Sequence, residues 1–209
     1  MKIIFDLDYT LLDTAEFKEK MAEILGENFK ADYEKYFKSE GVNFNLGEYL
    51  SILKKNGRID DETSEKMKAE VKELFLDIDD YLKFGVEKVL EHFKQRGYEL
   101  ILMTFGYKQW QKEKIKNLSI KKYFDEIIFE DKDKSQSEYL KSLGKKNEEV
   151  LIINDNLSEA EQMLKILKKG ELRLVKGPYN GKAENSAREL FEITREEREE
   201  NKIKELNLR

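Results

Sequence analysis

The sequence predicts an α/β protein with a doubly wound parallel sheet, into which a helical segment is inserted. Two features carry this prediction. From Tyr81 onward, short apolar runs typical of strands alternate with amphipathic helices, an order that requires crossover connections between parallel strands. Between the first strand and Asp80, by contrast, only helical patterns occur. We therefore expect a core built from residues 1–14 and 80–209 and an α-helical cap formed by residues 15–79.

Composition narrows the class of protein. The 209 residues are 40% charged and 39% hydrophobic, so the chain can bury a core beneath a charged surface. A net charge of -5 offers no broad basic face, which weighs against a nucleic-acid partner. Cysteine is absent, which excludes disulfides and thiol-based metal sites. No apolar run approaches a membrane span, and Met1 leads directly into a strand, so we expect a cytoplasmic protein with no membrane partner.

The first elements follow from local patterns. Lys2–Phe5 is a short, β-branched apolar run of the kind that forms a buried strand. Asp13 begins a helix in a variant of the capping box, and apolar residues then recur at helical spacing. Three more helices are expected around Tyr33–Phe37, Leu46–Lys55 and Asp61–Leu76, with breaks at Gly41 and at Asn56–Gly57. The aromatic and methionine residues of this insert indicate its own packed core.

Strands and helices alternate after the insert. The expected helices are Gly85–Arg96, Gln109–Leu118, Ser135–Leu143 and Leu157–Leu167, and the expected strands are Tyr98–Met103, Glu126–Phe129, Val150–Ile153 and Leu172–Val175. A final segment, Glu184–Arg209, indicates a packed helix followed by a solvated one. In such sheets ligands bind beyond the carboxyl ends of the strands. Candidate chemistry should therefore lie just after each strand.

Two carboxylates, Asp6 and Asp8, follow the first strand at once. Near a strand end they repel each other, and a divalent cation removes that conflict. Mg²⁺ is usually held by one or two carboxylates together with waters and substrate phosphate. With a metal bound, one aspartate can act as nucleophile and the other can move a proton. The plainer alternative is a turn or a helix cap, which is the usual role of a single aspartate in such a place.

The later strands are also followed by polar residues. Thr104 and Gly106 offer a hydroxyl and a turn whose backbone N–H groups could hold an anion. Asp155 follows the fourth strand, with Glu159 one helical turn beyond, and the loop 130–134 supplies cations. Taken singly, these residues indicate a turn, a helix cap and a solvated charge run. Together with the two aspartates they supply a nucleophile, an acid, a hydroxyl, a cation and a second metal carboxylate.

The string Asp6-Leu7-Asp8-Tyr9-Thr10 resembles the first motif of the haloacid dehalogenase-like superfamily, whose pattern is Asp-x-Asp-x-Thr after an apolar strand. The resemblance extends to about Leu190 and implies a Rossmann-like core, an α-helical cap and Mg²⁺-dependent chemistry through an aspartyl-phosphate. It makes Asp6 the nucleophile, Asp8 the general acid/base and Thr10 a supporting hydroxyl. Because the dehalogenase branch lacks an acid at the position of Asp8, the resemblance favours phosphoryl transfer over carbon–halogen hydrolysis.

The resemblance also assigns the later residues. It implies the catalytic residues Asp6, Asp8, Thr104 and Lys134 and the metal-site residues Asp6, Asp8, Asp155 and Glu159. Thr104 would bind the phosphate, Lys134 would neutralise nucleophile and phosphate, and Asp155 would be the second Mg²⁺ carboxylate. Lys132 competes with Lys134, whose spacing to the next helix is closer to the family's. Two positions depart from the family pattern, since Phe105 stands where many relatives have Asn and Asn154 replaces a Gly.

We therefore expect a Mg²⁺-dependent phosphomonoester hydrolase acting on a small-molecule phosphate ester, as a monomer or weak dimer. A phosphomutase of the same family and a catalytically idle binding protein remain the alternatives. The cap is expected to act as a lid that excludes phosphoproteins. Its basic turn around Asn56–Gly57, which includes Arg58, could meet the leaving group or be an ordinary solvated loop.

Overall fold

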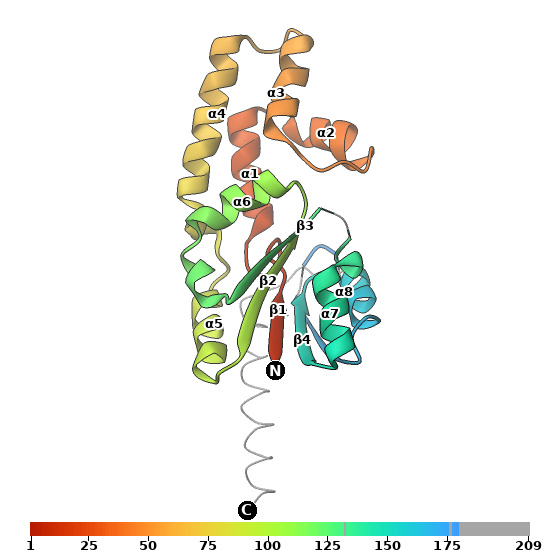
Figure 1. The fold of residues 1–209 in the computed structure, drawn as a ribbon. Coiled ribbons are helices and arrows are strands. Elements are labelled where there is room, and N and C mark those ends of the chain that lie inside the picture. The colour runs from red at the N-terminus through yellow and green to blue at the C-terminus, as the bar shows by residue number, and fades with distance from the viewer. Residues whose placement is uncertain (132, 176, 180–209) are drawn as a thin grey trace, which may run out of the picture.

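The structure is a computed structural model that describes residues 1–131, 133–175 and 177–179. At its centre lies a five-stranded parallel sheet of order β3-β2-β1-β4-β5 (Figure 1). The strands are β1 (Lys2–Phe5), β2 (Glu99–Phe105), β3 (Glu126–Glu130), β4 (Glu149–Asn154) and β5 (Lys169–Leu174). This confirms the doubly wound α/β fold. Because β1 is the middle strand, residues that follow it lie at the centre of the sheet's carboxyl edge.

The sheet is buried on both faces, which explains why β1 is continuously apolar from Ile3 to Phe5 rather than alternating. Ile3 and Phe5 belong to the hydrophobic core that includes α5 (Val86–Gln95), whereas Ile4 belongs to the core that includes α7 (Glu138–Lys146) and α8 (Leu157–Leu164). Successive side chains of a strand point to opposite faces, so this division follows from the strand itself. Helices on both faces hold β1 in place.

The insert is entirely helical. Its elements are α1 (Thr14–Leu25), α2 (Phe29–Tyr33), the π-helical η1 (Glu34–Lys38), α3 (Leu46–Lys55), α4 (Asp61–Leu76) and the 3₁₀ turn η2 (Ile78–Tyr81). α1 to α4 group beyond the carboxyl edge of the sheet, at the top of Figure 1. Asp13 caps α1 as expected, because its Oδ1 accepts a hydrogen bond from Glu16 N at 3.0 Å. A cluster of rings forms the core of the insert, with Phe44 5.2 Å from Phe37 between centroids.

The chain leaves the sheet for the insert and returns beside itself. Asp13 N donates to Tyr81 O at 2.7 Å, and Lys83 N donates to Leu11 O at 2.9 Å. The two connections to the insert are therefore hydrogen-bonded to each other. None of the helices in the described ranges is long and apolar enough to cross a membrane.

One further helix, α6 (Lys108–Asn117), lies between the sheet and the insert and contacts β2, β3 and α4. It is followed by the 3₁₀ turn η3 (Ser119–Tyr123). Because it contacts both parts of the molecule, α6 can link the position of the insert to residues at the sheet edge.

Several expected boundaries differ from the structure; for example, the helix expected as Leu157–Leu167 ends at Leu164. The second helix of the insert is divided into α2 and η1, and the helix expected from Ser135 is divided into a 3₁₀ turn, η4 (Lys134–Gln136), and α7. The division at α7 has a local cause, since the Ser137 hydroxyl accepts a hydrogen bond from Leu140 N and caps the helix there. The last strand begins at Lys169, three residues before the expected Leu172. The expected tail helices, Glu184–Arg209, lie outside the described residues.

Candidate active site

Asp6 is the first residue after β1 and forms an ion pair with Lys134. Lys134 Nζ lies 2.5 Å from Asp6 Oδ1 and 2.9 Å from Glu159 Oε2. Lys134 is only 2% exposed, so its ammonium is enclosed between two carboxylates. Burial raises the pKa of Asp6, and the Lys134 charge offsets this only in part. The competing lysine of this loop, Lys132, lies outside the described residues.

A short turn brings Lys134 to this position. Asp133 Oδ1 accepts a hydrogen bond from Ser135 N at 2.7 Å, which begins η4 directly after the loop that follows β3. Lys134 is the first residue of that turn. On the other side, Glu159 is fixed by Asn154, whose Nδ2 donates to Glu159 Oε2 at 2.7 Å. The residue that departs from the family's usual Gly therefore holds the acid that faces Lys134.

Thr10 joins Asp6 to Asp155. Its Oγ1 lies 3.1 Å from Asp6 Oδ2 and 3.3 Å from Asp155 Oδ1, and it accepts a hydrogen bond from Asp155 N at 3.1 Å. Within the described part of the chain, Asp155 Oδ2 is buried and has no hydrogen-bond partner. Burial, and then the negative charge of Asp6, raises the pKa of Asp155 to about 7. Two carboxylates thus meet around one hydroxyl, and the Lys83 charge offsets only part of the rise in the pKa of Asp155.

The donor set formed by Asp6 and Asp155 fits Mg²⁺. The ion takes oxygen ligands and is usually held by one or two carboxylates together with waters and substrate phosphate. A cation here would engage the unpartnered Asp155 Oδ2 and relieve the repulsion that raises the pKa of Asp155. No three His, Cys, Asp or Glu side chains of the described residues are grouped as a complete metal cage. The protein would therefore supply few of the ligands itself.

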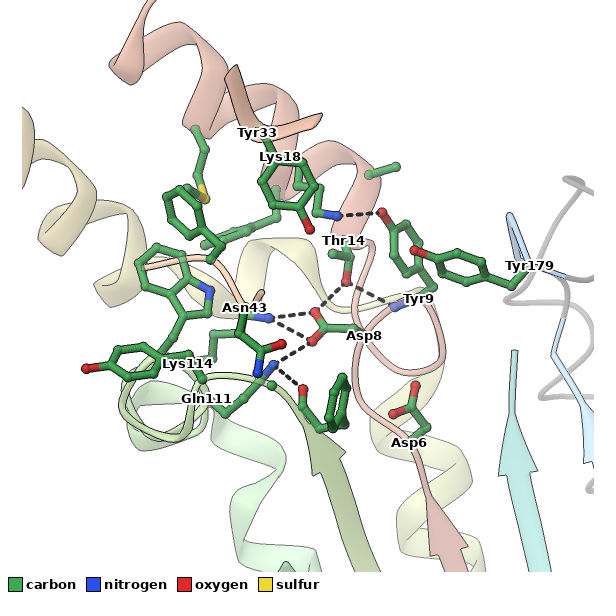
Figure 2. Close-up of a pocket in the computed structure, with 18 of the residues that line it drawn as sticks. Asp6, Asp8, Tyr9, Thr14, Lys18, Tyr33, Asn43, Gln111, Lys114 and Tyr179 are labelled. Carbon is green, nitrogen blue, oxygen red and sulfur yellow. Dashed lines mark hydrogen bonds and ion pairs between the residues drawn. The ribbon is translucent and has the colours of Figure 1, made fainter. Parts of the chain in front are cut away.

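The carboxylate of Asp8 is bound by residues of α6. Lys114 Nζ lies 2.7 Å and 2.8 Å from its two oxygens, and Gln111 Nε2 donates to Oδ2 at 3.1 Å. The Thr14 hydroxyl donates to Oδ1 at 2.8 Å. Figure 2 shows Asp8 turned toward Lys114 and Gln111. Burial alone would raise the pKa of Asp8, but the Lys114 charge and these hydrogen bonds lower it overall.

Four residues were expected at the metal, and the structure brings them into two arrangements. Asp6 and Asp155 share the Thr10 hydroxyl, and Asp6 and Glu159 share Lys134, whereas the Asp8 carboxylate is bound by Lys114. The metal-binding roles of all four stay predictions. Glu159 is linked to Asp6 through Lys134.

Thr104 lies near the end of β2 and is 1% exposed. Its hydroxyl is buried and without a hydrogen-bond partner in the described residues, so it has donor capacity left over. It does not line the cavity above the site, whereas the next residues, Phe105 and Gly106, do. Phosphate binding by Thr104 therefore stays a prediction.

The backbone between the two aspartates and α1 is strained at Tyr9, whose φ of 62° is unusual for a residue with a side chain. Two contacts hold this conformation. Tyr9 N donates to the Thr14 hydroxyl at 3.0 Å, and Lys83 Nζ donates to the Tyr9 carbonyl. Strained residues persist where the surrounding structure enforces them, commonly at functional sites. Here these two contacts hold the strained turn that carries Asp8.

A cavity of about 720 Å³ lies above these residues, between the sheet edge and the insert. Asp6, Asp8, Lys134 and Asp155 line it from the core, and Lys18, Tyr33 and Phe44 line it from the insert. The side chains of the described residues therefore leave space for a ligand over Asp6 and Lys134. Figure 2 shows Asp6, Asp8 and several of the other residues that line this space.

Arg58 does not line this cavity. Its Nη1 lies 2.7 Å from Asp32 Oδ2, which also accepts a hydrogen bond from the Tyr49 hydroxyl at 3.0 Å. The turn that carries Arg58 joins α3 to α4 at the end of the insert remote from the sheet (Figure 1). The suggestion that this turn meets the leaving group is not supported, because the Arg58 guanidinium is bound within the insert.

The contributors to the site that were missed at the level of sequence include Lys114, Gln111, Thr14 and Gly177. Lys114 and Gln111 are three residues apart and share a helix face, but α6 is so rich in lysine that no pattern distinguishes one of them. At Gly177, a Cβ atom would lie 2.7 Å from Asp155 Oδ2. The lack of a side chain there is required by the close approach to Asp155, which only the fold reveals.

Comparison with known proteins adds a family and a fold. Residues 3–165 match the family described as haloacid dehalogenase-like hydrolase. A haloacid dehalogenase-like hydrolase from Burkholderia xenovorans has a similar structure, with a TM-score of 0.66 and 18% identity over 87% of this chain and 84% of that one. No curated protein matches the chain.

Two further structures are similar. A Thermotoga maritima protein provisionally described as a β-phosphoglucomutase has a TM-score of 0.61 and 23% identity over 93% of this chain and 99% of that one. A Bacillus subtilis HAD-hydrolase described as bound to magnesium has a TM-score of 0.51 and 16% identity over 80% and 84%. At these identities the structural likeness establishes the fold alone.

Proposed function

The chain belongs to the haloacid dehalogenase-like hydrolase family, and from this premise we propose that it is a Mg²⁺-dependent phosphomonoesterase acting on a small phosphate ester through an aspartyl-phosphate intermediate. One observation carries the proposal. Lys134 is buried between Asp6 and Glu159, and Thr10 ties Asp6 to a second carboxylate, Asp155, which has an unpartnered oxygen. This arrangement suits a nucleophile beside a site for a cation and a phosphoryl group.

In the first step, a carboxylate oxygen of Asp6 attacks phosphorus and the ester P–O bond breaks. The leaving alkoxide takes a proton from Asp8, and Lys134 offsets the charge on the phosphoryl oxygens. In the second step, Asp8 takes a proton from water, whose oxygen attacks phosphorus and breaks the bond to Asp6. Inorganic phosphate and the alcohol are the products, and both aspartates return to their starting forms.

Mg²⁺ held by Asp6 and Asp155 would neutralise negative charge on the phosphoryl group and fix its orientation. The residues of the chain do the rest. Thr10 holds the two carboxylates at a set separation, and Asn154 holds Glu159 against Lys134. Lys114, Gln111 and Thr14 keep Asp8 in one orientation. Asp8 must acquire a proton before it can act as an acid. Because the Lys114 charge lowers the pKa of Asp8 and so opposes protonation, the contact between Lys114 and Asp8 has to loosen during turnover.

The helical insert would act as a lid. The cavity lies between it and the sheet edge, so a substrate must fit beneath α1, α2 and the segment that precedes α3. We expect small phosphate esters to enter and phosphoproteins to be excluded. Closure over the site would also exclude bulk water, which strengthens the electrostatic interactions between the phosphoryl group and the residues around it.

The test is phosphate release from a panel of esters that includes p-nitrophenyl phosphate, sugar phosphates and a phosphopeptide, with Mg²⁺ and with chelator. We expect release from small esters that depends on Mg²⁺ and falls roughly 10³-fold or more in Asp6→Asn. Asp131→Asn, an exposed residue outside the site, is the matched control. Retention of the wild-type rate in Asp6→Asn would refute the nucleophile.

The same panel separates the two alternatives. A phosphomutase would convert a sugar phosphate into its isomer and release little inorganic phosphate. A catalytically idle binding protein would turn over none of the esters under any metal condition.

A further inference from the structure

The cavity above Asp6 is much larger than a phosphoryl group requires. Its volume is about 720 Å³, within the range of pockets that enclose an organic ligand of drug size, roughly 300–1,000 Å³. Asp6, Lys134 and Asp155 occupy only its floor. The remaining wall, contributed by the insert and by loops of the core, surrounds whatever group is esterified to the phosphate. The side chains of that wall therefore indicate the chemistry of the leaving alcohol.

On the core side, several aromatic rings are open to the cavity. Phe105 and Tyr107, in the segment after β2, are 40% and 42% exposed, and Tyr179, after β5, is 55% exposed. All three line the cavity. The Tyr179 ring meets the Tyr9 ring edge-on, with centroids 5.5 Å apart. Large rings exposed together in a cavity are typical of a surface that a ligand covers.

On the insert side, Lys18 and Tyr33 complete this wall. Lys18 Nζ lies 5.0 Å from the centroid of the Tyr33 ring and 5.3 Å from that of the Tyr9 ring, and it donates to the Tyr9 hydroxyl at 3.1 Å. Figure 2 shows Lys18, Tyr33, Tyr9 and Tyr179 gathered on one side of the cavity. A single ammonium thus lies against one ring from the insert and one from the core.

We propose that the leaving alcohol of the substrate carries a flat aromatic ring, which packs among Tyr9, Tyr33 and Tyr179 while the phosphate lies at Asp6. The inference rests on the proposed phosphomonoesterase function and names its substrate class. Aromatic rings pack edge-to-face and offset on one another, and a cation beside them favours an electron-rich ring face. A plain sugar phosphate has no aromatic ring to cover these exposed aromatic side chains, so the wall favours a ring-bearing alcohol.

Two matched pairs of probes test the ring directly. Adenosine 5′-monophosphate and ribose 5-phosphate carry their phosphate on the same primary alcohol and differ in the ring, as do 2-phenylethyl phosphate and ethyl phosphate. With Mg²⁺ we expect kcat/KM to be roughly tenfold higher for the ring-bearing member of at least one pair. The preference should shrink in Tyr33→Leu and in Tyr179→Leu. Tyr36→Leu, a half-buried tyrosine of the insert that does not line the cavity, should keep it.

A binding measurement separates this inference from the proposed function. Trp110 is the single tryptophan of the chain and lines the cavity, so its fluorescence reports occupancy. In Asp6→Asn, the ring-bearing esters should bind roughly tenfold more tightly than their partners. Tighter ring binding without turnover by the wild type would refute the phosphatase and retain the ring site. Turnover and binding that are equal within both pairs would overturn the ring site and leave the phosphatase in place.

Discussion

Lys114 and Asp8 form a nearly buried ion pair, with Nζ 2.7 Å and 2.8 Å from the two carboxylate oxygens. The Lys114 side chain is 5% exposed and that of Asp8 24%. The lysine belongs to α6, which contacts both the sheet and α4 of the insert. The orientation of the proposed acid/base is therefore set by a helix that also contacts the insert. Lys114 is a positioning residue, because it acts on the reaction through Asp8.

Replacing Lys114 by Met should lower kcat for an alkyl phosphate roughly 10–100-fold, with a smaller loss for p-nitrophenyl phosphate. An alkoxide needs the proton that Asp8 supplies, whereas nitrophenolate leaves without it. Steady-state kinetics on the two esters measure the difference, with KM read separately. Lys116→Met, an exposed lysine of the same helix, is the control. Equal losses on both esters would show that Lys114 supports only the fold.

Lys134→Met should destabilise the protein and remove most activity. The substitution leaves Asp6 and Glu159 buried without their shared cation, and breaking a buried ion pair in this way typically costs about 3–5 kcal/mol. Chemical denaturation gives the free energy of unfolding, and phosphate release gives the rate. Lys132→Met is expected to change both far less. If Lys132→Met were instead the more damaging change, the site cation would have to be reassigned.

In the metal-free protein, Asp155 should contribute a loss of stability as pH rises from about 4 to about 7. Burial and the charge of Asp6 raise the pKa of Asp155 to about 7, from 3.8 for an ordinary aspartate. Between these values the folded protein keeps a proton that the unfolded chain has released, so rising pH favours unfolding. Below that window both states are protonated, and above it neither is.

Thermal unfolding across this pH range, with chelator, measures the slope. Asp155→Asn should lack the part of the slope that Asp155 contributes, and Asp131→Asn should retain it. Mg²⁺ should raise Tm most at neutral pH, where Asp155 is ionised and can bind the cation. A wild-type slope that Asp155→Asn leaves unchanged would exclude Asp155 as its source.

Gly177→Ala should weaken Mg²⁺ activation because the added Cβ would lie 2.7 Å from Asp155 Oδ2 and displace that carboxylate. The Mg²⁺ concentration at half-maximal activity should rise roughly tenfold or more, within the range seen when groups that orient metal ligands are altered. Gly47→Ala, where the nearest atom would be Asn45 Oδ1 at 3.4 Å, should have no such effect. An unchanged Mg²⁺ requirement in Gly177→Ala would show that Asp155 can move aside without cost.

The fold could be predicted because its signals are local. The apolar run Lys2–Phe5 and the helices Leu46–Lys55 and Asp61–Leu76 have in the structure the bounds expected from pattern alone. The predicted boundaries were wrong where a single capping side chain determines the helix end, as Ser137 does at the start of α7. Such contacts compete with helix continuation by small margins.

The site could be predicted only in part, for a physical reason. Asp6, Thr10, Lys134 and Asp155 follow strands, and parallel strands bring their carboxyl ends to one edge, so sequence order implies proximity. Lys114 instead reaches the site from within a helix, where it resembles its lysine neighbours until the fold buries it. The sequence shows that lysine is abundant in α6, and burial alone distinguishes the lysine that binds Asp8.

The paired connections of the insert also bring its two ends together. Leu11 and Asp13, on the segment that leads into the insert, are hydrogen-bonded to Lys83 and Tyr81, on the segment that leads out of it. The two ends of the insert therefore lie within hydrogen-bonding distance of each other. A two-residue splice could bridge that gap, and a foreign domain with adjacent termini could be grafted there.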